Sequence, residues 1–184
     1  MTADLVERAQ QGDRDAFDAL ARAAVYRLYA VARRVLRDPG LAEDAVQECL
    51  VRAWRDLRAL RDADRFDAWL FRLLLNACRD EQRRSHRRPV QIALGAWDGP
   101  GSADGPADLE RRDELERGFA RLSVEHRMAL ALHHYLGLRP AEIGRLLGVP
   151  EGTVTSRLHY GGRALRAVLE ADRSIRTSEA GAAR

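Results

Sequence analysis

A cluster of hydroxyl, guanidinium and aromatic side chains between residues 153 and 160 offers the clearest chemistry in this sequence. The cluster consists of Thr153, Thr155, Ser156, Arg157, His159 and Tyr160. Hydroxyl groups bind phosphate oxygens, and a guanidinium group binds phosphate or the edge of guanine through two parallel hydrogen bonds. The cluster therefore predicts contact with the backbone and bases of DNA.

The segment from Pro140 to Leu158 has the pattern of two helices around a tight turn, which would position this cluster. Pro140 suits the first position of a helix, and Gly148 can adopt the positive φ of a turn. Gly144 leaves room for two helices to cross closely. In a helix-turn-helix the second helix enters the major groove, so we expect the helix that begins near Glu151 to face bases. An ordinary helical hairpin with accidental glycines is the alternative.

Two glycines follow the cluster directly, at Gly161 and Gly162. Each glycine inside a helix costs about 1 kcal/mol relative to alanine. The pair therefore predicts that the second helix ends or bends there.

The charge of the chain supports a nucleic-acid partner once it is divided by position. All 31 basic residues of the 184 are arginines, and they stand against 28 acidic residues. Residues 1–88 hold 18 arginines and 15 acids, residues 89–108 hold three aspartates and no base, and residues 109–184 hold 13 arginines and 10 acids. Two arginine-bearing units are thus separated by an acidic segment.

Apolar periodicity and linker composition together predict an all-α protein of two small helical domains joined by a flexible acidic linker. Residues 89–108 are rich in glycine and proline and lack periodicity, which is typical of a linker. Apolar residues recur at helical spacing in four segments of residues 1–88, with Asp13 as a cap, a break at Asp38-Pro39-Gly40, and a third helix from about Leu41 to Leu60. The second domain spans residues 109–170 and begins with a helix from Leu109 through Phe119. Residues 171–184 are expected to form a disordered tail.

Several function classes are disfavoured by composition. No run approaches the ~18 apolar residues that cross a bilayer, and the N-terminus lacks a leader pattern, which predicts a cytoplasmic protein without membrane insertion. Cys49 and Cys78 fall on apolar helical stripes, which predicts buried thiols. An enzyme or metal protein would have to use four histidines without any Glu-x-x-His arrangement. These are His126, His133, His134 and His159. We therefore expect no catalytic activity, no cofactor and no metal.

Two helices of the first domain carry further functional patterns. The third helix buries Ala45, Val46 and Cys49 in the expected packing, together with Leu50 and Trp54. Its opposite face bears Glu43, Asp44, Gln47, Glu48 and Arg52. The fourth helix, from about Arg65 to Arg84, ends in a basic cluster of Arg83, Arg84, Arg87 and Arg88.

With both halves in view, residues 5 to 170 resemble the extracytoplasmic-function subgroup of the bacterial sigma-70 transcription initiation factors. Three passages carry the resemblance: residues 41–54, residues 66–76, and the helix-turn-helix with Gly152-Thr153-Val154 and Ser156-Arg157-Leu158. The first looks like the family's acidic helix that docks on the clamp helices of the largest RNA polymerase subunit. The resemblance assigns this role to Glu43, Asp44, Gln47, Glu48 and Arg52.

The second passage is similar to the family's promoter-melting helix. The resemblance implies that the loop from Arg61 to Arg65 and the following helix capture an unpaired base of the downstream (−10) element. The residues expected to do so are Arg61, Asp64, Arg65, Trp69, Arg72, Asn76, Arg83 and Arg84. A core position for Trp69 and a solvated helix end for the arginines are the alternatives. Leu74-Leu75 is a small departure from the family pattern.

The third passage matches the domain that reads the upstream (−35) element, but it departs from the family at three positions. The family commonly has basic residues where this chain has Thr155, Tyr160 and Gly162. Each good base contact contributes ~1–3 kcal/mol. We therefore expect weaker or altered upstream recognition.

The resemblance also implies partners. These are core RNA polymerase, through its clamp helices and the flap of its second-largest subunit, promoter DNA, and an anti-sigma factor. The acidic linker would thread polymerase channels or act as a plain tether. A helix-turn-helix regulator that never contacts polymerase is the competing interpretation.

Overall fold

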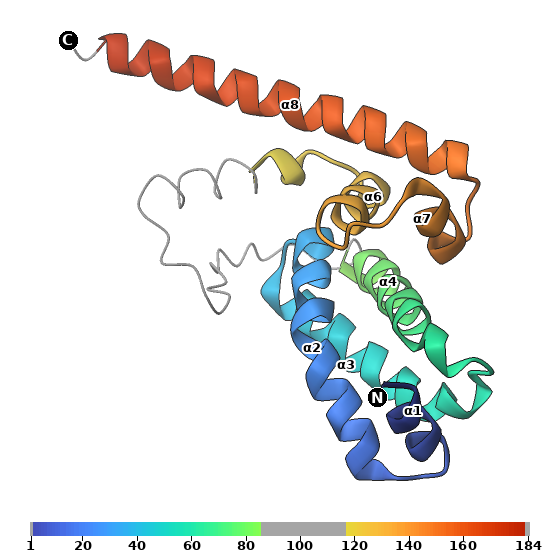
Figure 1. Cartoon of the computed structure of the whole chain (residues 1–184). Helices are drawn as coiled ribbons and strands as arrows, with labels where there is room; N and C mark the ends of the chain where they lie inside the picture. The colour runs from blue at the N-terminus through green and yellow to red at the C-terminus, as the bar shows by residue number, and fades with distance from the viewer. Residues whose placement is uncertain (1, 86–116, 183–184) are drawn as a thin grey trace.

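A computed structural model describes residues 2–85 and 117–182 (Figure 1). Every regular element in these two ranges is a helix, which confirms the all-α class. The elements are α1 (Thr2–Gln10), α2 (Arg14–Leu36), α3 (Pro39–Asp56), η1 (Leu57–Ala59), η2 (Ala63–Arg65), α4 (Phe66–Ser85), α6 (Val124–His134), α7 (Pro140–Leu147) and α8 (Glu151–Ala182). The expected linker 89–108, Arg87, Arg88 and most of the helix expected from Leu109 to Phe119 lie outside the described residues.

The helices of the first domain begin where short polar side chains can cap them. The Asp13 carboxylate accepts a hydrogen bond from the Ala16 amide at 3.0 Å, and this caps α2. Asp38 caps α3 in the same way, with Pro39 at the first helical position. Helix α3 thus begins two residues earlier than predicted. It also ends earlier, at Asp56, where η1 replaces the last predicted turn.

Helix α3 lies between α2 and α4, and its apolar stripe fills the core of the first domain. Ala45, Cys49 and Ala53 are fully buried along this stripe. Cys49 and Cys78 are buried free thiols, as predicted. Burial is the main cause that raises the pKa of each thiol to about 12.

The helix-turn-helix of the second domain forms as predicted. Ser123 caps α6, and Gly148 ends α7 with a φ of 68°. A Cβ atom on Gly144 would lie 2.9 Å from the Val149 carbonyl oxygen, so only glycine permits this close approach. Helix α8 then begins at Glu151 and packs against both α6 and α7.

The prediction that the second helix ends or bends at Gly161-Gly162 is wrong. Helix α8 continues through both residues to Ala182, so residues 171–182 are helical where a disordered tail was expected. Gly161 is buried, and a Cβ atom there would lie 3.2 Å from the Cβ of His126. The close packing of α6 on α8 at this position offsets the low helix propensity of glycine.

The two domains pack against each other. Helix α6 contacts α2, and α7 contacts α4, so the second domain covers one end of the first (Figure 1). Buried apolar residues from both domains form one continuous cluster. No helix within residues 2–85 and 117–182 is long and apolar enough to cross a membrane.

Candidate nucleic-acid interface and docking face

The exposed face of α3 combines acidic and apolar side chains. Glu43, Asp44 and Gln47 are exposed, as expected. Val51 lies four residues after Gln47 on the same face and is 61% exposed. Trp54, which was predicted to point inward, is 42% exposed and contacts the Phe17 ring edge to face at 4.9 Å between centroids. These five residues of α3 (Glu43, Asp44, Gln47, Val51 and Trp54) are called the docking face below.

Glu48 and Arg52 lie at the border between α3 and α4 instead. Arg52 Nε donates to Glu48 Oε1 at 2.7 Å, and its Nη2 donates to Asp80 Oδ2 on α4 at 3.1 Å. The hydrogen bond that Arg52 donates to Glu48 is the main cause that raises the pKa of Arg52. Only 22% of the Arg52 side chain is exposed. Arg52 therefore joins two helices, and its predicted contact with polymerase stays a prediction.

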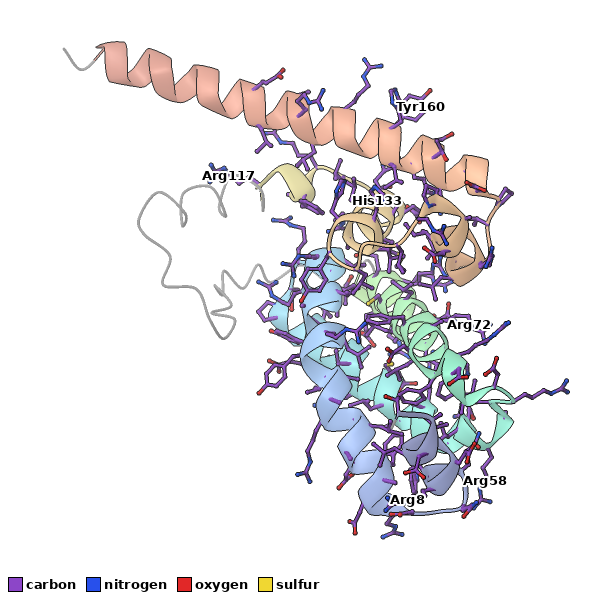
Figure 2. The ribbon with its side chains drawn as sticks, in the orientation of Figure 1. Arg8, Arg58, Arg72, Arg117, His133 and Tyr160 are labelled. Atoms are coloured by element: carbon purple, nitrogen blue, oxygen red, sulfur yellow. The ribbon has the colours of Figure 1, made fainter. Side chains whose placement is uncertain are left out.

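A row of polar side chains follows one face of α4. The row begins with Arg65, the last residue of η2, and continues on α4 with Trp69, Arg72, Asn76 and Arg83. Successive members are three, four or seven residues apart, which places them in line along the helix. Arg72 projects into solvent from the middle of α4 (Figure 2). We call these five residues the α4 row.

Hydrogen bonds hold parts of this row in place. Asn76 is exposed, and its Oδ1 accepts a hydrogen bond from Arg79 Nη1 at 3.2 Å. Arg83 Nη2 donates to Asp80 Oδ1 at 3.1 Å. Arg84, which points away from the row, pairs with the buried Glu81. The arginines at the end of α4 are therefore paired with acids of their own helix, while Arg72 has no ion pair within the described residues.

Trp69 has features both of a core residue and of a surface residue that could contact an unpaired base. It is half-buried and packs against the hydrophobic core, with its ring 6.1 Å from that of Phe66. The side chain is therefore partly exposed, three residues before the exposed Arg72 and seven before the exposed Asn76. This position allows one edge of the ring to support the fold and the remainder to contact a base.

The loop before α4 is ordered by an aspartate that sequence analysis did not select. Asp62 Oδ1 accepts from the Asp64 amide at 3.1 Å, and Asp62 Oδ2 pairs with Arg65 Nε at 3.0 Å. Arg61 and Asp64 are exposed on this loop. The loop thus brings polar side chains to the start of the α4 row.

The first turns of α8 present few free polar groups. Thr155 Oγ1 donates to the Glu151 carbonyl at 3.1 Å, and Ser156 Oγ donates to the Gly152 carbonyl at 2.9 Å. Thr153 and Arg157 are half-buried. His159 and Tyr160 are exposed, and Tyr160 lies on the side of α8 away from α6 (Figure 2). Arg157 is thus the single cation of the predicted DNA-contacting cluster.

Two features of these surfaces were missed at the sequence level. The exposure of Val51 follows from its position seven residues after Asp44, a spacing that was visible in the sequence. The position of Arg79 depends on the packing of the second domain, so no local pattern could have revealed it. Across the residues that the structure describes, no group of three or more His, Cys, Asp or Glu side chains could hold a metal ion.

Together these surfaces define a class: a two-domain helical protein with a helix-turn-helix for DNA and a separate acidic and apolar face suited to a protein partner. Residues 20–88 match the family model for Sigma-70 region 2, and residues 112–166 match that for Sigma-70 region 4.

Known proteins agree with these matches. ECF RNA polymerase sigma factor SigL of Mycobacterium tuberculosis is 39% identical over 149 residues, which cover 78% of this chain and 82% of SigL. Sigma factor SigM of the same species is 35% identical over 155 residues, which cover 84% of this chain and 78% of SigM. The structure of CnrH in complex with the cytosolic domain of CnrY matches with a TM-score of 0.69 and 27% identity, over 93% of this chain and 98% of the other. The chain belongs to the extracytoplasmic-function sigma factors of the sigma-70 family.

The family match extends over both domains. The region 2 match includes the docking face and the α4 row, and the region 4 match includes the helix-turn-helix. A polymerase-independent regulator would need only the helix-turn-helix of the region 4 match. Membership of the family therefore excludes the competing interpretation.

Proposed function

We propose that this chain binds core RNA polymerase through the docking face and directs it to promoters, without catalytic activity of its own. The observation that supports this most strongly is the combination of Glu43, Asp44 and Gln47 with the exposed apolar groups of Val51 and Trp54. Exposed aromatic and aliphatic groups inside a charged rim are typical of protein interfaces. Such a face has no use in a protein that binds only DNA.

The α4 row is proposed to open the downstream element. A base can be read on its Watson-Crick edge only after it leaves the stack. The exposed amide of Asn76 can hydrogen-bond that edge, and the accessible part of Trp69 can stack on the base. Arg72, which is exposed and has no ion pair within the described residues, would bind a phosphate of the same strand.

The helix-turn-helix is proposed to read the upstream element by its α8 residues. Arg157 would bind guanine or phosphate, and Tyr160 and His159 would contact the backbone. With Thr155 and Ser156 bonded to their own helix, this contact supplies less affinity than the α4 row.

The proposed setting is the cytoplasm, where the factor would be held inactive by an anti-sigma protein. CnrH, one similar protein of known structure, was solved with the cytosolic domain of a second protein, CnrY. A partner of this kind would compete for the docking face or the α4 row.

The proposed function is tested by association with purified core polymerase and by transcription from a promoter that core alone ignores. Val51→Asp places a charge at the centre of the docking face and should abolish both. Tyr26→Asp is the matched control, because Tyr26 is a 66% exposed aromatic on α2. Absence of any association of the unsubstituted chain would contradict the proposal.

A further inference from the structure

Helix α1 lies outside the residues that match Sigma-70 region 2, yet it packs against the segment that precedes α4. It contacts both η1 and η2, the two short helices between α3 and α4. We propose that Gln10, the last residue of α1, is a positioning residue that holds the loop between η1 and α4 in the geometry for capture of a downstream base. The inference rests on the proposed function, since this loop carries Arg65, the first member of the α4 row.

The side-chain amide of Gln10 joins α1 to both ends of η1. Its Nε2 donates hydrogen bonds to the Leu57 carbonyl at 3.0 Å and to the Leu60 carbonyl at 2.7 Å. A primary amide has two N–H donors on one nitrogen, so a single side chain satisfies both acceptors. Gln10 is half-buried, where a carbonyl that loses its partner costs free energy. The amide therefore fixes the position at which the chain leaves η1.

A hydrogen bond in the opposite direction completes this link. Arg58 of η1 donates from Nε to the backbone carbonyl of Gln10 at 3.2 Å. Gly12 follows α1 with a φ of 99°, and a Cβ atom there would lie 3.9 Å from Arg58 Nη2. The end of α1 and η1 are thus joined by side chains from both partners. Figure 2 shows Arg58 at the same end of the first domain as Arg8 of α1.

Helix α1 is itself held firmly enough to act as a support. Val6 and Ala9 are buried in the core of the first domain. Arg8 Nη2 pairs with Asp13 Oδ2 at 2.7 Å, and Asp13 caps α2. The turn between α1 and α2 is therefore fixed on both sides, and Gln10 extends this fixed geometry to η1.

The loop beyond η1 depends on the Gln10 contact at its first residue. Leu60 is followed directly by the exposed Arg61, and the next fixed residue is Asp62, which accepts a hydrogen bond from the Asp64 amide. Binding sites hold their contacts within about 0.5 Å through supporting hydrogen bonds. Loss of the Gln10 amide would release the peptide between Leu60 and Arg61 while α4 keeps its place. Gln10 therefore affects which base is accepted more than how tightly the DNA backbone is bound.

The preference among downstream bases tests this role. Gln10→Met keeps the length of the side chain and removes both donors, and Gln11→Met, at the exposed neighbouring position, is the matched control. Transcription with core polymerase is compared between templates that differ in one downstream base. The ratio between two templates does not depend on the fraction of active factor, so a merely structural role would leave it unchanged. We expect Gln10→Met to reduce this ratio about fivefold, and to leave the ratio between templates that differ in the upstream element unchanged.

Hydrogen exchange in the free chain tests the contact without polymerase. The amides of Leu60, Asp64 and Arg65 donate hydrogen bonds within this loop. They should exchange several-fold faster in Gln10→Met than in the control. Arg58→Ala removes the opposite hydrogen bond and should change both measurements in the same direction to a smaller extent. It carries the test if Gln10→Met does not fold.

The outcomes separate this inference from the proposed function. An unchanged downstream ratio, or unchanged exchange of the loop amides, overturns the role of Gln10. Equal decreases of the upstream and downstream ratios overturn it as well, because they indicate a general loss of recognition. An unsubstituted chain that never stimulates core polymerase instead contradicts the proposed function, whereas the exchange measurement still decides whether Gln10 holds the loop.

Discussion

The α4 row of the first domain and the first turns of α8 in the second, both proposed to contact DNA, differ in how their polar groups are arranged. Along α4, Asn76 and Arg72 are exposed, and neighbouring acids such as Asp80 fix the arginines around them. On α8, the hydroxyls of Thr155 and Ser156 bond to backbone carbonyls of the same helix. The first surface offers exposed groups that neighbouring side chains hold in place, and the second offers one half-buried arginine beside the exposed His159 and Tyr160.

The difference suggests where promoter affinity arises. A surface whose donors are free and already positioned loses little entropy on binding. A surface whose hydroxyls must first break internal hydrogen bonds gains less from each contact. We therefore infer that the first domain contributes more to promoter selection than the helix-turn-helix.

The largest expected effect concerns the rigidity of the first domain. Only thiolates react with disulfide reagents, and a pKa of about 12 in place of the ordinary value of 9.0 lowers the thiolate fraction at pH 8 roughly a thousandfold. Cys49 and Cys78 should therefore react that much more slowly in the folded chain than in urea. Reaction as fast as that of a free thiol would show that the core between α3 and α4 opens readily to solvent.

The same thiols give a pH dependence of stability. The folded chain retains their protons up to about pH 12, whereas the unfolded chain releases them near pH 9. A pKa raised by folding means that stability is complete below the unfolded value and decreases as pH rises through this range. Urea unfolding between pH 8 and 11 should show this decrease, and replacement of both cysteines by alanine should reduce it.

A further prediction tests directly whether the α4 row opens the downstream element. Trp69→Ala removes a base-stacking surface that contributes ~1–3 kcal/mol, and Asn76→Ala removes a hydrogen bond of similar size, so together they should reduce promoter opening roughly a hundredfold. Permanganate reactivity of unpaired thymines measures the opening. Arg55→Ala is the control, since Arg55 is exposed and pairs with the adjacent Asp56 of its own helix. Normal promoter opening by the double variant would show that Trp69 and Asn76 do not open the downstream element.

Another prediction concerns the affinity of the second domain for upstream DNA, which an added cation on α8 should increase. Thr155→Arg restores a cation on an exposed position of α8, and one added phosphate contact should raise affinity for an upstream-element duplex by about tenfold at low salt. The salt dependence should become steeper by about one charge. Thr153→Arg, at a half-buried position, serves as the comparison variant. No gain from Thr155→Arg would indicate that α8 does not face DNA through this position.

The smallest expected effect concerns the hydrogen bonds by which Arg52 links α3 to α4, the helix that carries most of the α4 row. Arg52→Ala breaks the link to Glu48 and Asp80 and should reduce the free energy of unfolding by about 1 kcal/mol, since the pair is partly buried. Arg22→Ala, which removes an exposed pair at 3.8 Å, should change stability by much less. Urea titrations monitored by circular dichroism compare the two. Equal effects of the two substitutions would mean that the link between α3 and α4 stabilises the fold no more than an exposed ion pair does.

The sequence predicted the helices well because their signals are local. Asp13 and Ser123 are cap residues recognisable from type alone, and both cap the helices expected. The helix-turn-helix depends on Gly144 and Gly148, whose roles are also local. The failure at Gly161 has a different cause. Its neighbours His126 and Leu130 come from another helix, so its compatibility with α8 is a tertiary effect.

The candidate site was predictable to a similar extent. Helical periodicity placed Glu43, Asp44 and Gln47 on one face, and it could equally have placed Val51 there. It could not show that Trp54 would remain exposed, because that depends on the edge contact with Phe17 from α2. The interdomain position of Arg79 and Glu125 was likewise beyond local patterns.

Transcription by purified core polymerase with this chain, from a promoter library randomised at both elements, tests the central claim most directly. Start sites and abundances are obtained by sequencing the transcripts, with core alone as the control. We expect transcripts that depend on the chain, with strong sequence preference at the downstream element and weaker preference upstream. Transcripts that depend mainly on the upstream element, or none beyond those of core alone, would contradict the claim.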